Sequence, residues 1–329
     1  MPPGFIAQRM PDSEACRRLM ELDPLNPFAT PAYLEAETAL GAEPWLFGFE
    51  RDGSFTGCLA FIRSGRLNRS LTIASAPDAP PEFWEGVKTF SKDERITAIA
   101  VNTFASRAAC IPELGEETSR IERFEFLVAL DGSPEQLLER MRVNHRQSVR
   151  KGIKQGLTVR AGDVCSLTEH IQLMAASMER RQLRGENAVC EASVESLRPY
   201  VESGFCRLFQ AVLDGRVVSS MTVACAPRAF YLHTSGTNAA GMAAGASHFL
   251  LYEIMKAGQM EQLSKFNLGG VADRDSGLAQ YKERFGAEVV RLEAAEFYTG
   301  NALHKAVSAS ARLMKHALDR ARTLGGGGR

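Results

Sequence analysis

Apolar and polar residues alternate in several short runs along this chain, and segments with helical spacing lie between the runs. Two pairs of alternating runs flank an Asp-Gly step: residues 45–49 and 56–61 around Asp52-Gly53, and residues 208–213 and 217–224 around Asp214-Gly215. An Asp-Gly step between alternating runs favours a tight β-hairpin turn. The pattern therefore predicts two similar hairpins, and their faint repetition indicates two copies of one fold.

The rest of the chain predicts strands and helices in alternation. Further strands are expected at residues 71–74, 96–101, 124–130 and 157–160, and helices at residues 13–22 (capped by Ser13), 32–40, 82–90 and 301–323. Alternating short strands and helices are typical of a mixed sheet covered by helices. We therefore expect the α/β fold class, with an α+β mixed sheet.

The segment from residue 230 to residue 260 has an order of predicted elements that suits the binding of an anion. A strand at 230–233 leads into a loop rich in glycine and alanine, and Ser247 is expected to cap the helix that follows. A glycine loop before a helix N-terminus presents free amides and the positive end of the helix dipole. Gly245 and Ser247 are therefore candidates for binding a phosphate or a developing oxyanion.

A second unit of strand and helix follows directly. The strand at 265–268 is closed by Gly269-Gly270, and Gly286 ends the next helix. Asp273 or Asp275 is expected to cap that helix. Asp273 could alternatively bind an incoming ammonium group.

These segments resemble the second half of the Fem-type (FemABX) peptidyltransferases, which are built from two GNAT-like acyltransferase domains. The matching residues are Gly245-Ala246-Ser247 with Leu250, Phe266 to Gly270, Gly277-Leu278, Tyr281-Lys282 and Phe285-Gly286. Tyr281 replaces the usual Phe of that family, and Asn267 stands where Asp is commoner. The resemblance implies two tandem GNAT-like domains: residues 1–135, then residues 136–300, which carry the recognisable motifs, then a C-terminal helix and flexible glycine tail at 301–329.

Composition agrees with a two-domain protein and excludes several classes. The chain has 329 residues, 45% of them hydrophobic, and 39 basic residues balance 39 acidic ones, so no global field favours nucleic acid or a membrane, and any such attraction must be local. Seven cysteines without a CxxC pair argue against a disulfide framework or a zinc site. The N-terminus lacks a signal-peptide pattern, and no 18-residue apolar run exists. We expect a soluble, cytoplasmic protein without a membrane span.

A strongly basic segment runs from residue 140 to residue 160. Arg142, Arg146 and Arg150 are four residues apart and share one helix face. With Lys151 they could bind phosphates, although a basic face is equally compatible with a solvated helix end. The segment also resembles a Fem-type element, and in that family this region bears on the phosphate-containing substrate.

The resemblance also implies candidate catalytic residues. In the Fem-type enzymes the lysine that matches Lys282 lies by the reacting carbonyl, where it can stabilise negative charge. Tyr231 and His233 alternate on one strand and are expected on one side of it, where His233 could serve as a base for the attacking amine or could simply be a core residue. Tyr281 and Tyr252 are candidates for lining the substrate site, with core packing as the alternative.

We therefore expect an acyltransferase that joins an activated carboxyl group to an amine without a metal, a cofactor or a covalent intermediate. In the Fem-type pattern the donor is an aminoacyl-tRNA, and the acceptor is an amine on a cell-wall precursor or a small molecule. Two alternatives stay open. The same fold could use acyl-CoA to acylate a sugar or small amine, with the CoA pyrophosphate at residues 241–246, or it could be a non-catalytic ligand-binding module.

Overall fold

The computed structural model describes residues 1–66, 68–105, 110–186, 190 and 192–300. Its strands are β1 (Phe5–Arg9), β2 (Glu43–Arg51), β3 (Ser54–Ser64), β4 (Arg69–Ile73), β5 (Ala98–Asn102), β6 (Glu116–Ala129), β7 (Thr158–Gly162), β8 (Cys206–Leu213), β9 (Arg216–Cys225), β10 (Ala229–Thr237), β11 (Lys265–Val271) and β12 (Glu288–Tyr298). Its helices are α1 (Ser13–Leu22), α2 (Pro31–Ala39), α3 (Pro81–Asp93), α4 (Pro134–Arg140), α5 (Val143–Lys154), α6 (Leu167–Leu183), α7 (Val194–Glu202), α8 (Ala239–Ala244), α9 (Ala246–Met260) and α10 (Gly277–Glu283), with short 3-10 turns η1 (Pro27–Ala29) and η2 (Val164–Ser166). The helix expected at 301–323 lies outside the described residues.

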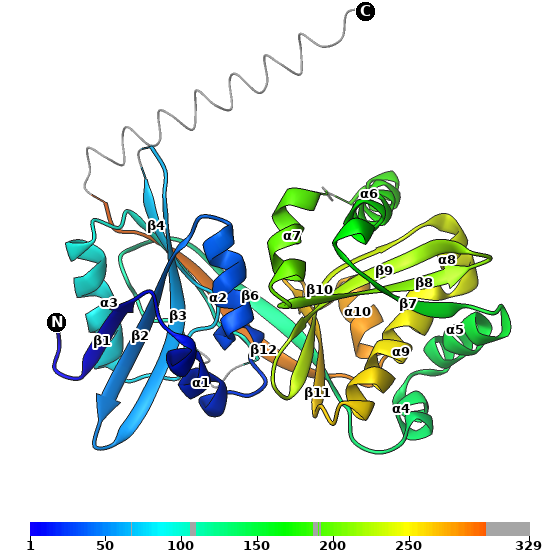
Figure 1. Cartoon of the computed structure of the whole chain (residues 1–329), viewed down its shortest axis with the longest axis horizontal. Coiled ribbons are helices and arrows are strands. Elements are labelled where there is room, and N and C mark those ends of the chain that lie inside the picture. The colour runs from blue at the N-terminus through cyan, green and yellow to red at the C-terminus, as the bar shows by residue number, and fades with distance from the viewer. Residues whose placement is uncertain (67, 106–109, 187–189, 191, 301–329) are drawn as a thin grey trace, which may run out of the picture.

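The described strands form one twelve-stranded sheet that runs through both halves of the molecule (Figure 1). Its order is β1-β2-β3-β4-β5-β12-β6-β11-β10-β9-β8-β7. The β4–β5 and β10–β11 pairs are parallel and the other pairs are antiparallel, which confirms the predicted mixed α/β sheet. β12 returns from the end of the described chain to lie between β5 and β6, where Ala295 and Phe297 join the core of the N-terminal half.

Both predicted hairpins are present, one in each half. β2 pairs with β3 and β8 pairs with β9, both antiparallel. At the turns Asp52 and Gly53 have φ of 50° and 78°, and Asp214 and Gly215 have 49° and 75°. Two consecutive residues with positive φ match a type I′ turn, the geometry that Asp-Gly adopts readily.

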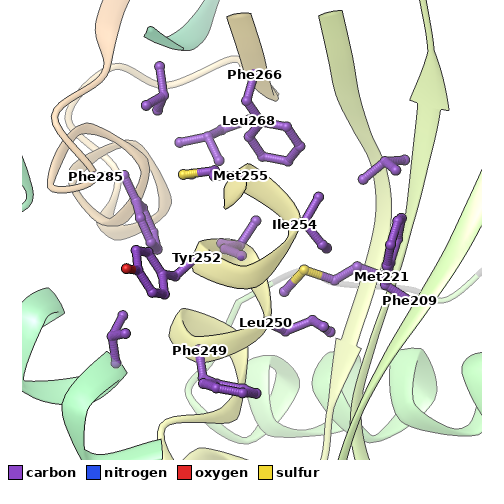
Figure 2. Close-up of a cluster of buried hydrophobic side chains, with 14 of the residues drawn as sticks. Phe209, Met221, Phe249, Leu250, Tyr252, Ile254, Met255, Phe266, Leu268 and Phe285 are labelled. Atoms are coloured by element: carbon purple, nitrogen blue, oxygen red, sulfur yellow. The ribbon is translucent and has the colours of Figure 1, made fainter. Parts of the chain in front are cut away.

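The core of the C-terminal half is built around α9. Phe249, Leu250, Ile254 and Met255 form an apolar stripe on α9, and all four side chains are buried. Figure 2 shows these side chains between strand residues such as Met221 on one side and Phe285, which follows α10, on the other. Burial of each large apolar side chain stabilises the fold by about 1.5–3 kcal/mol, so this helix fixes the elements on both of its sides.

An aromatic cluster joins the two halves. Phe28 from the N-terminal half contacts Phe205 and Tyr231 from the C-terminal half, with ring centroids 6.1 and 5.7 Å apart. Tyr33 on α2 lies 4.9 Å from Phe205 by the same measure. Such ring pairs stabilise a fold by more than the burial of their apolar area alone. The seam between the halves is therefore a packed interface.

Three predicted helix starts are wrong in detail. Asp12 caps α1 in place of Ser13, and Ser276 caps α10 in place of Asp273 or Asp275. The predicted glycine loop is largely α8, which Asn238 caps and which Gly245 (φ 75°) separates from α9, so Ser247 lies inside the helix. Alanine at most positions of 239–244 favours helix, which explains why this segment is not a loop.

Among the described residues, no helix combines the length and the apolar character needed to span a bilayer. The same residues contain no group of three or more His, Cys, Asp and Glu side chains arranged to hold a metal ion.

Candidate active site

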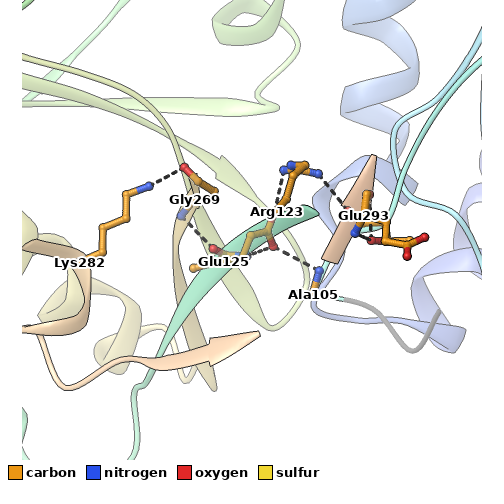
Figure 3. A network of polar contacts seen from close by, with 9 residues as sticks. Ala105, Arg123, Glu125, Gly269, Lys282 and Glu293 are labelled. Atoms are coloured by element: carbon orange, nitrogen blue, oxygen red, sulfur yellow. Dashed lines mark hydrogen bonds and ion pairs between the residues drawn. The ribbon is translucent and has the colours of Figure 1, made fainter. Parts of the chain in front are cut away.

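Lys282 is buried on α10, with 7% of its surface exposed. Its Nζ donates a hydrogen bond to the carbonyl oxygen of Gly270 at 3.0 Å (Figure 3). α10 is held from behind by α5. The His145 Nε2 lies 3.0 Å from the Tyr281 carbonyl oxygen, and the Arg142 backbone amide donates to the Arg284 carbonyl. The lysine that the sequence analysis favoured therefore has a fixed position inside the protein.

Glu125 on β6 is a buried acid whose charge acts on Lys282. Its side chain is 0% exposed. The Asn267 amide nitrogen donates to Glu125 Oε2 at 2.8 Å, and the Ala105 backbone amide donates to the same oxygen at 3.2 Å (Figure 3). Burial raises the pKa of Glu125, while the bonds from Asn267 and Arg123 oppose that rise. A buried carboxylate of this kind persists only with such partners.

Arg123, two residues before Glu125, adds a second cation. Its Nη2 donates to Glu125 Oε1 at 3.2 Å, and its Nη1 donates to the Thr103 carbonyl at 3.1 Å. Burial lowers the pKa of Lys282 to about 8, Glu125 opposes this shift, and Arg123 adds to it. At neutral pH Lys282 is therefore mostly an ammonium group.

A bulge in β11 interrupts the regular strand pairing next to Lys282 and Glu125. The register of β11 against β6 shifts between Asn267 and Gly270, and Gly269 has φ of +78°. A methyl group on Gly269 would lie 3.1 Å from the Leu232 carbonyl oxygen, 3.6 Å from Lys282 Nζ and 3.8 Å from Tyr231 Oη. The Lys282 ammonium and the Tyr231 hydroxyl thus face one point beside Gly269. The positive φ at this position favours glycine over residues with a side chain.

Tyr231 and Gly269 lie where two parallel strands separate. β10 pairs with β11 only through Ala229 to Tyr231, and β10 has a register irregularity against β9 immediately afterwards. Burial raises the pKa of Tyr231 far above its usual range, with Glu125 as a further cause. The Tyr231 hydroxyl therefore stays protonated and can donate a hydrogen bond.

His233 belongs to a different group of side chains. Its ring lies 5.4 Å from Tyr200 and 6.2 Å from Phe205, and its Nδ1 is 3.5 Å from Thr222 Oγ1. Burial lowers the pKa of His233 to about 4, although Glu37 opposes the shift, so the ring is neutral at pH 7. The role of His233 as a base stays a prediction.

Ser247, Tyr281 and Tyr252 lie on the side of α10 and α9 that faces α5 and α4. Burial raises the pKa of Tyr281 to about 12, and a hydrogen bond with Ser247 opposes the shift. The Tyr252 hydroxyl donates to the Pro134 carbonyl at 3.3 Å. A methyl group on Gly245 would lie 2.6 Å from the Ser148 carbonyl oxygen. These contacts serve packing of helices, and none of them joins the Lys282 group.

The remaining predicted residues, Asp273 and three cations of α5, lie at the surface. Asp273 is exposed and accepts the Asp275 backbone amide at 2.9 Å in the turn before α10. Arg146 on α5 donates to the Glu139 carbonyl at 2.8 Å. Arg150 and Lys151 are exposed, and none of these three α5 cations forms an ion pair within the described part of the chain.

Arg123, Glu125 and Asn267 are the site residues that the sequence analysis did not assign. Glu125 stands between Phe124 and Phe126 in an apolar strand, and an acid in such a run is the one feature that could have indicated it. Their meeting with Lys282 depends on the pairing of β6 with β11, which the sequence pattern does not define.

Comparison with known proteins supports this architecture. Residues 139–283 match the family of acetyltransferase (GNAT) domains. No curated protein sequence matches the chain significantly. Among solved structures, FemX superposes with a TM-score of 0.67 at 13% identity, covering 91% of this chain and 99% of that chain.

Two further structures share the fold. The C-terminal domain of a putative lysylphosphatidylglycerol synthetase from Agrobacterium fabrum has a TM-score of 0.51 at 15% identity, covering 92% of this chain and 96% of that chain. A tandem GNAT protein from the clavulanic acid biosynthesis pathway has a TM-score of 0.53 at 10% identity, covering 91% and 99%. The predicted resemblance is thus confirmed at the level of the fold: the chain has the tandem fold of the Fem-type and GNAT-like acyltransferases.

Proposed function

We propose that the chain is an aminoacyltransferase that moves an amino acid from aminoacyl-tRNA to an amine acceptor. The amine nitrogen forms a bond to the ester carbonyl carbon, and the ester bond to the tRNA ribose breaks. The nitrogen loses one proton, and the ribose oxygen gains one. The reaction needs no metal and no covalent enzyme intermediate, and we assign it to the cytoplasm, where charged tRNA is found.

The observation that carries this proposal is the polar group around Gly269-Gly270. Acyl transfer to an amine passes through a tetrahedral state with negative charge on the former carbonyl oxygen. The buried Lys282 ammonium and the Tyr231 hydroxyl face one point beside Gly269 and can stabilise that charge. Glu125 and Asn267 do not contact the substrate in this scheme. They position Gly269 and Lys282, since the Asn267 side-chain oxygen accepts the Gly269 amide at 2.8 Å.

Charge on α5 supports a polyanionic donor. Arg150, Lys151 and Lys154 are exposed and have no ion-pair partner among the described residues, whereas most other arginines of the chain pair with acids. Unpaired cations on one helix can neutralise successive phosphates of an RNA backbone.

Packing of α8 argues against the acyl-CoA alternative. The segment expected to cradle a CoA pyrophosphate, 241–246, is helical up to Ala244. A methyl group on Gly241 would lie 2.3 Å from the Val218 carbonyl oxygen, and one on Gly245 would lie 2.6 Å from the Ser148 carbonyl oxygen. These glycines therefore allow close approach of the protein's own backbone rather than of a ligand.

Donor binding tests the proposal against both alternatives. The purified chain is titrated with charged total tRNA and, separately, with acetyl-CoA and longer acyl-CoAs at two salt concentrations. We expect binding to tRNA that weakens steeply as salt rises, because each phosphate contact releases a counterion. Saturable binding of CoA with indifference to tRNA would favour the acyl-CoA alternative. If donors bind but no amine is acylated, the chain is a binding module.

A further inference from the structure

A buried histidine, His145, lies in the first turn of α5 where α5, α9 and α10 meet. Its side chain is 3% exposed. Its ring packs against Phe285, Tyr281 and His248, with centroids 4.6, 5.2 and 4.4 Å away. Tyr281 belongs to α10, and His248 belongs to α9. Burial alone would favour an apolar side chain at this position, so the ring nitrogens of His145 need an explanation.

One of these nitrogens forms a hydrogen bond next to Lys282. Nε2 of His145 lies 3.0 Å from the Tyr281 carbonyl oxygen, and a carbonyl oxygen can only accept, so Nε2 carries the hydrogen. Nδ1 then bears a lone pair, and it has no hydrogen-bond partner among the described residues. Burial lowers the pKa of His145, so the ring is mostly neutral at pH 7. His145 is thus a neutral donor to the peptide bond that joins Tyr281 to Lys282.

The residues before α5 also contact α10 and the turn after it. The Arg142 backbone amide donates to the Arg284 carbonyl oxygen at 2.8 Å. A methyl group on Gly286 would lie 2.8 Å from the Arg140 carbonyl oxygen, so the two backbones approach closely there. α10 has only seven residues, and isolated helices shorter than about 12 residues are marginal in water. The position of α10 therefore depends on such contacts.

The Lys282 ammonium depends on α10 for its place. In the part of the chain that the structure describes, Nζ makes one hydrogen bond, to the Gly270 carbonyl oxygen at 3.0 Å. One bond at the tip of a flexible side chain does not define where its backbone lies. A displacement of about 1 Å in a reacting group can cost a hundred-fold in rate. Any residue that fixes the backbone at Lys282 therefore matters for a reaction beside Gly269.

We propose that His145 is a positioning residue for Lys282 and links it to the basic helix α5. Arg146 follows His145 directly, and Arg150 lies about one turn further along the same helix. A polyanionic donor bound to these cations shifts α5, and His145 transmits the shift to the peptide bond before Lys282. His145 itself does not touch the substrate. The positioning of Lys282 stands on the contacts alone, whereas the link to the donor rests on the proposed function.

Matched variants separate the hydrogen bond from packing. His145→Phe keeps an aromatic ring and removes the donor, and His145→Gln restores a donor, because the glutamine amide nitrogen reaches about as far as Nε2. His248→Phe is the control, since His248 packs in the same cluster and its Nδ1 has no hydrogen-bond partner within the described chain. Urea denaturation shows which variants fold. If His145→Phe does not fold, His145→Asn replaces it, because its shorter amide does not reach the place of Nε2.

Labelling of amines with trace acetic anhydride over a range of pH tests the positioning without any substrate. Mass spectrometry of the peptide that holds Lys282 gives the titration midpoint, which should be near 8 in the wild type because burial lowers the pKa of Lys282 to about 8. In His145→Phe the midpoint should rise by about one pH unit, since a displaced lysine is less desolvated. His145→Gln should restore the wild-type midpoint, and His248→Phe should keep it. Equal midpoints in the wild type and His145→Phe, or equal changes in the two phenylalanine variants, would overturn the positioning role.

The same labelling with uncharged total tRNA tests the link to the donor. The tRNA should change the labelling rate of Lys282 about two-fold or more in the wild type and leave it unchanged in His145→Phe, because the coupling between the two places is lost. A labelling rate that ignores tRNA in the wild type, or that responds equally in both proteins, would overturn the link.

Transfer kinetics distinguish this inference from the proposed function. With charged tRNA, His145→Phe should lower kcat about ten-fold and keep KM for the tRNA within about two-fold, because the cations of α5 are intact. A higher labelling midpoint in His145→Phe, without transfer by any of the proteins, would remove the proposed function and keep the positioning role. Transfer with the wild-type kcat in His145→Phe would remove the positioning role and keep the proposed function.

Discussion

The C-terminal half carries its functional cation inside the protein, whereas the N-terminal half carries acids around an open cleft. Lys282 is buried near Glu125 and Arg123, and hydrogen bonds hold its ammonium group, the Glu125 carboxylate and the Arg123 guanidinium in place. In the cleft, Asp78 is exposed and has no ion pair within the described residues. Buried groups with fixed partners suit charge stabilisation during a reaction, whereas an exposed acid is solvated and its ion pairs contribute little to stability.

The comparison also explains why both halves are needed. Glu125 lies on β6, which β12 and β11 flank on either side. Phe28 of the N-terminal half contacts Tyr231 of the C-terminal half. The proposed reaction site therefore lies at the seam between the two halves.

The largest effect is expected at Lys282. Lys282→Ala should lower kcat/KM for transfer by a factor of about a hundred to a thousand, the usual cost of removing one donor that stabilises an oxyanion. Affinity for charged tRNA should be unchanged. Lys256→Ala is the matched control, because that lysine pairs with Glu253 on α9 and lies outside the group. Steady-state rates within a factor of a few of wild type would contradict the assignment of Lys282.

Removing the acid beside Lys282 should destabilise the fold. Glu125→Ala leaves the buried Lys282 and the half-buried Arg123 without their counterion, so we expect the free energy of unfolding to fall by about 3 kcal/mol. Urea denaturation measures this change. Glu122→Ala, on the same strand in a surface ion pair with Arg291, should cost less than about 1 kcal/mol. Equal losses in the two variants would mean that Glu125 is no more important than a surface acid.

The basic face of α5 should affect donor binding alone. Replacing both Arg150 and Lys151 with alanine should weaken tRNA binding several-fold and reduce the salt dependence by roughly one phosphate contact per cation removed. Lys92→Ala, an exposed change on α3, serves as the control. Fluorescence titration at several salt concentrations gives both quantities. An unchanged salt dependence in the α5 variant would place the RNA elsewhere on the protein.

The smallest effect is a pH dependence. The pKa of Lys282 is lowered to about 8, so its charge is present at neutral pH and is lost as pH rises through that value. If the ammonium stabilises the oxyanion, kcat at saturating substrates should decline above that pH. A kcat that keeps rising there would instead indicate that neutral Lys282 acts as a base.

Much of the fold follows from local patterns, while the site depends on long-range pairing. The hairpins at Asp52-Gly53 and Asp214-Gly215 were predicted because the turn chemistry lies in adjacent residues. Helix starts were less certain, because several candidate caps stand close together before α1 and α10 and only one can have the required extended backbone.

The site itself could be predicted only in part. Of the residues in the candidate site, Lys282 and Tyr231 were proposed from the sequence, the first through the family resemblance, but Arg123 and Glu125 were not. An alternating strand does not show which face meets the other half of a protein, so the burial of Glu125 is decided by the β6–β11 and β6–β12 pairings.

The most direct test of the central claim is a single-turnover reaction between charged total tRNA and a panel of small amines, with products identified by mass spectrometry. We predict one aminoacylated amine for each tRNA that loses its amino acid, at a rate that depends on Lys282. Loss of the amino acid from tRNA only at the rate seen without protein, and without an amide product, would contradict the claim that the seam between the two halves is an acyl-transfer site.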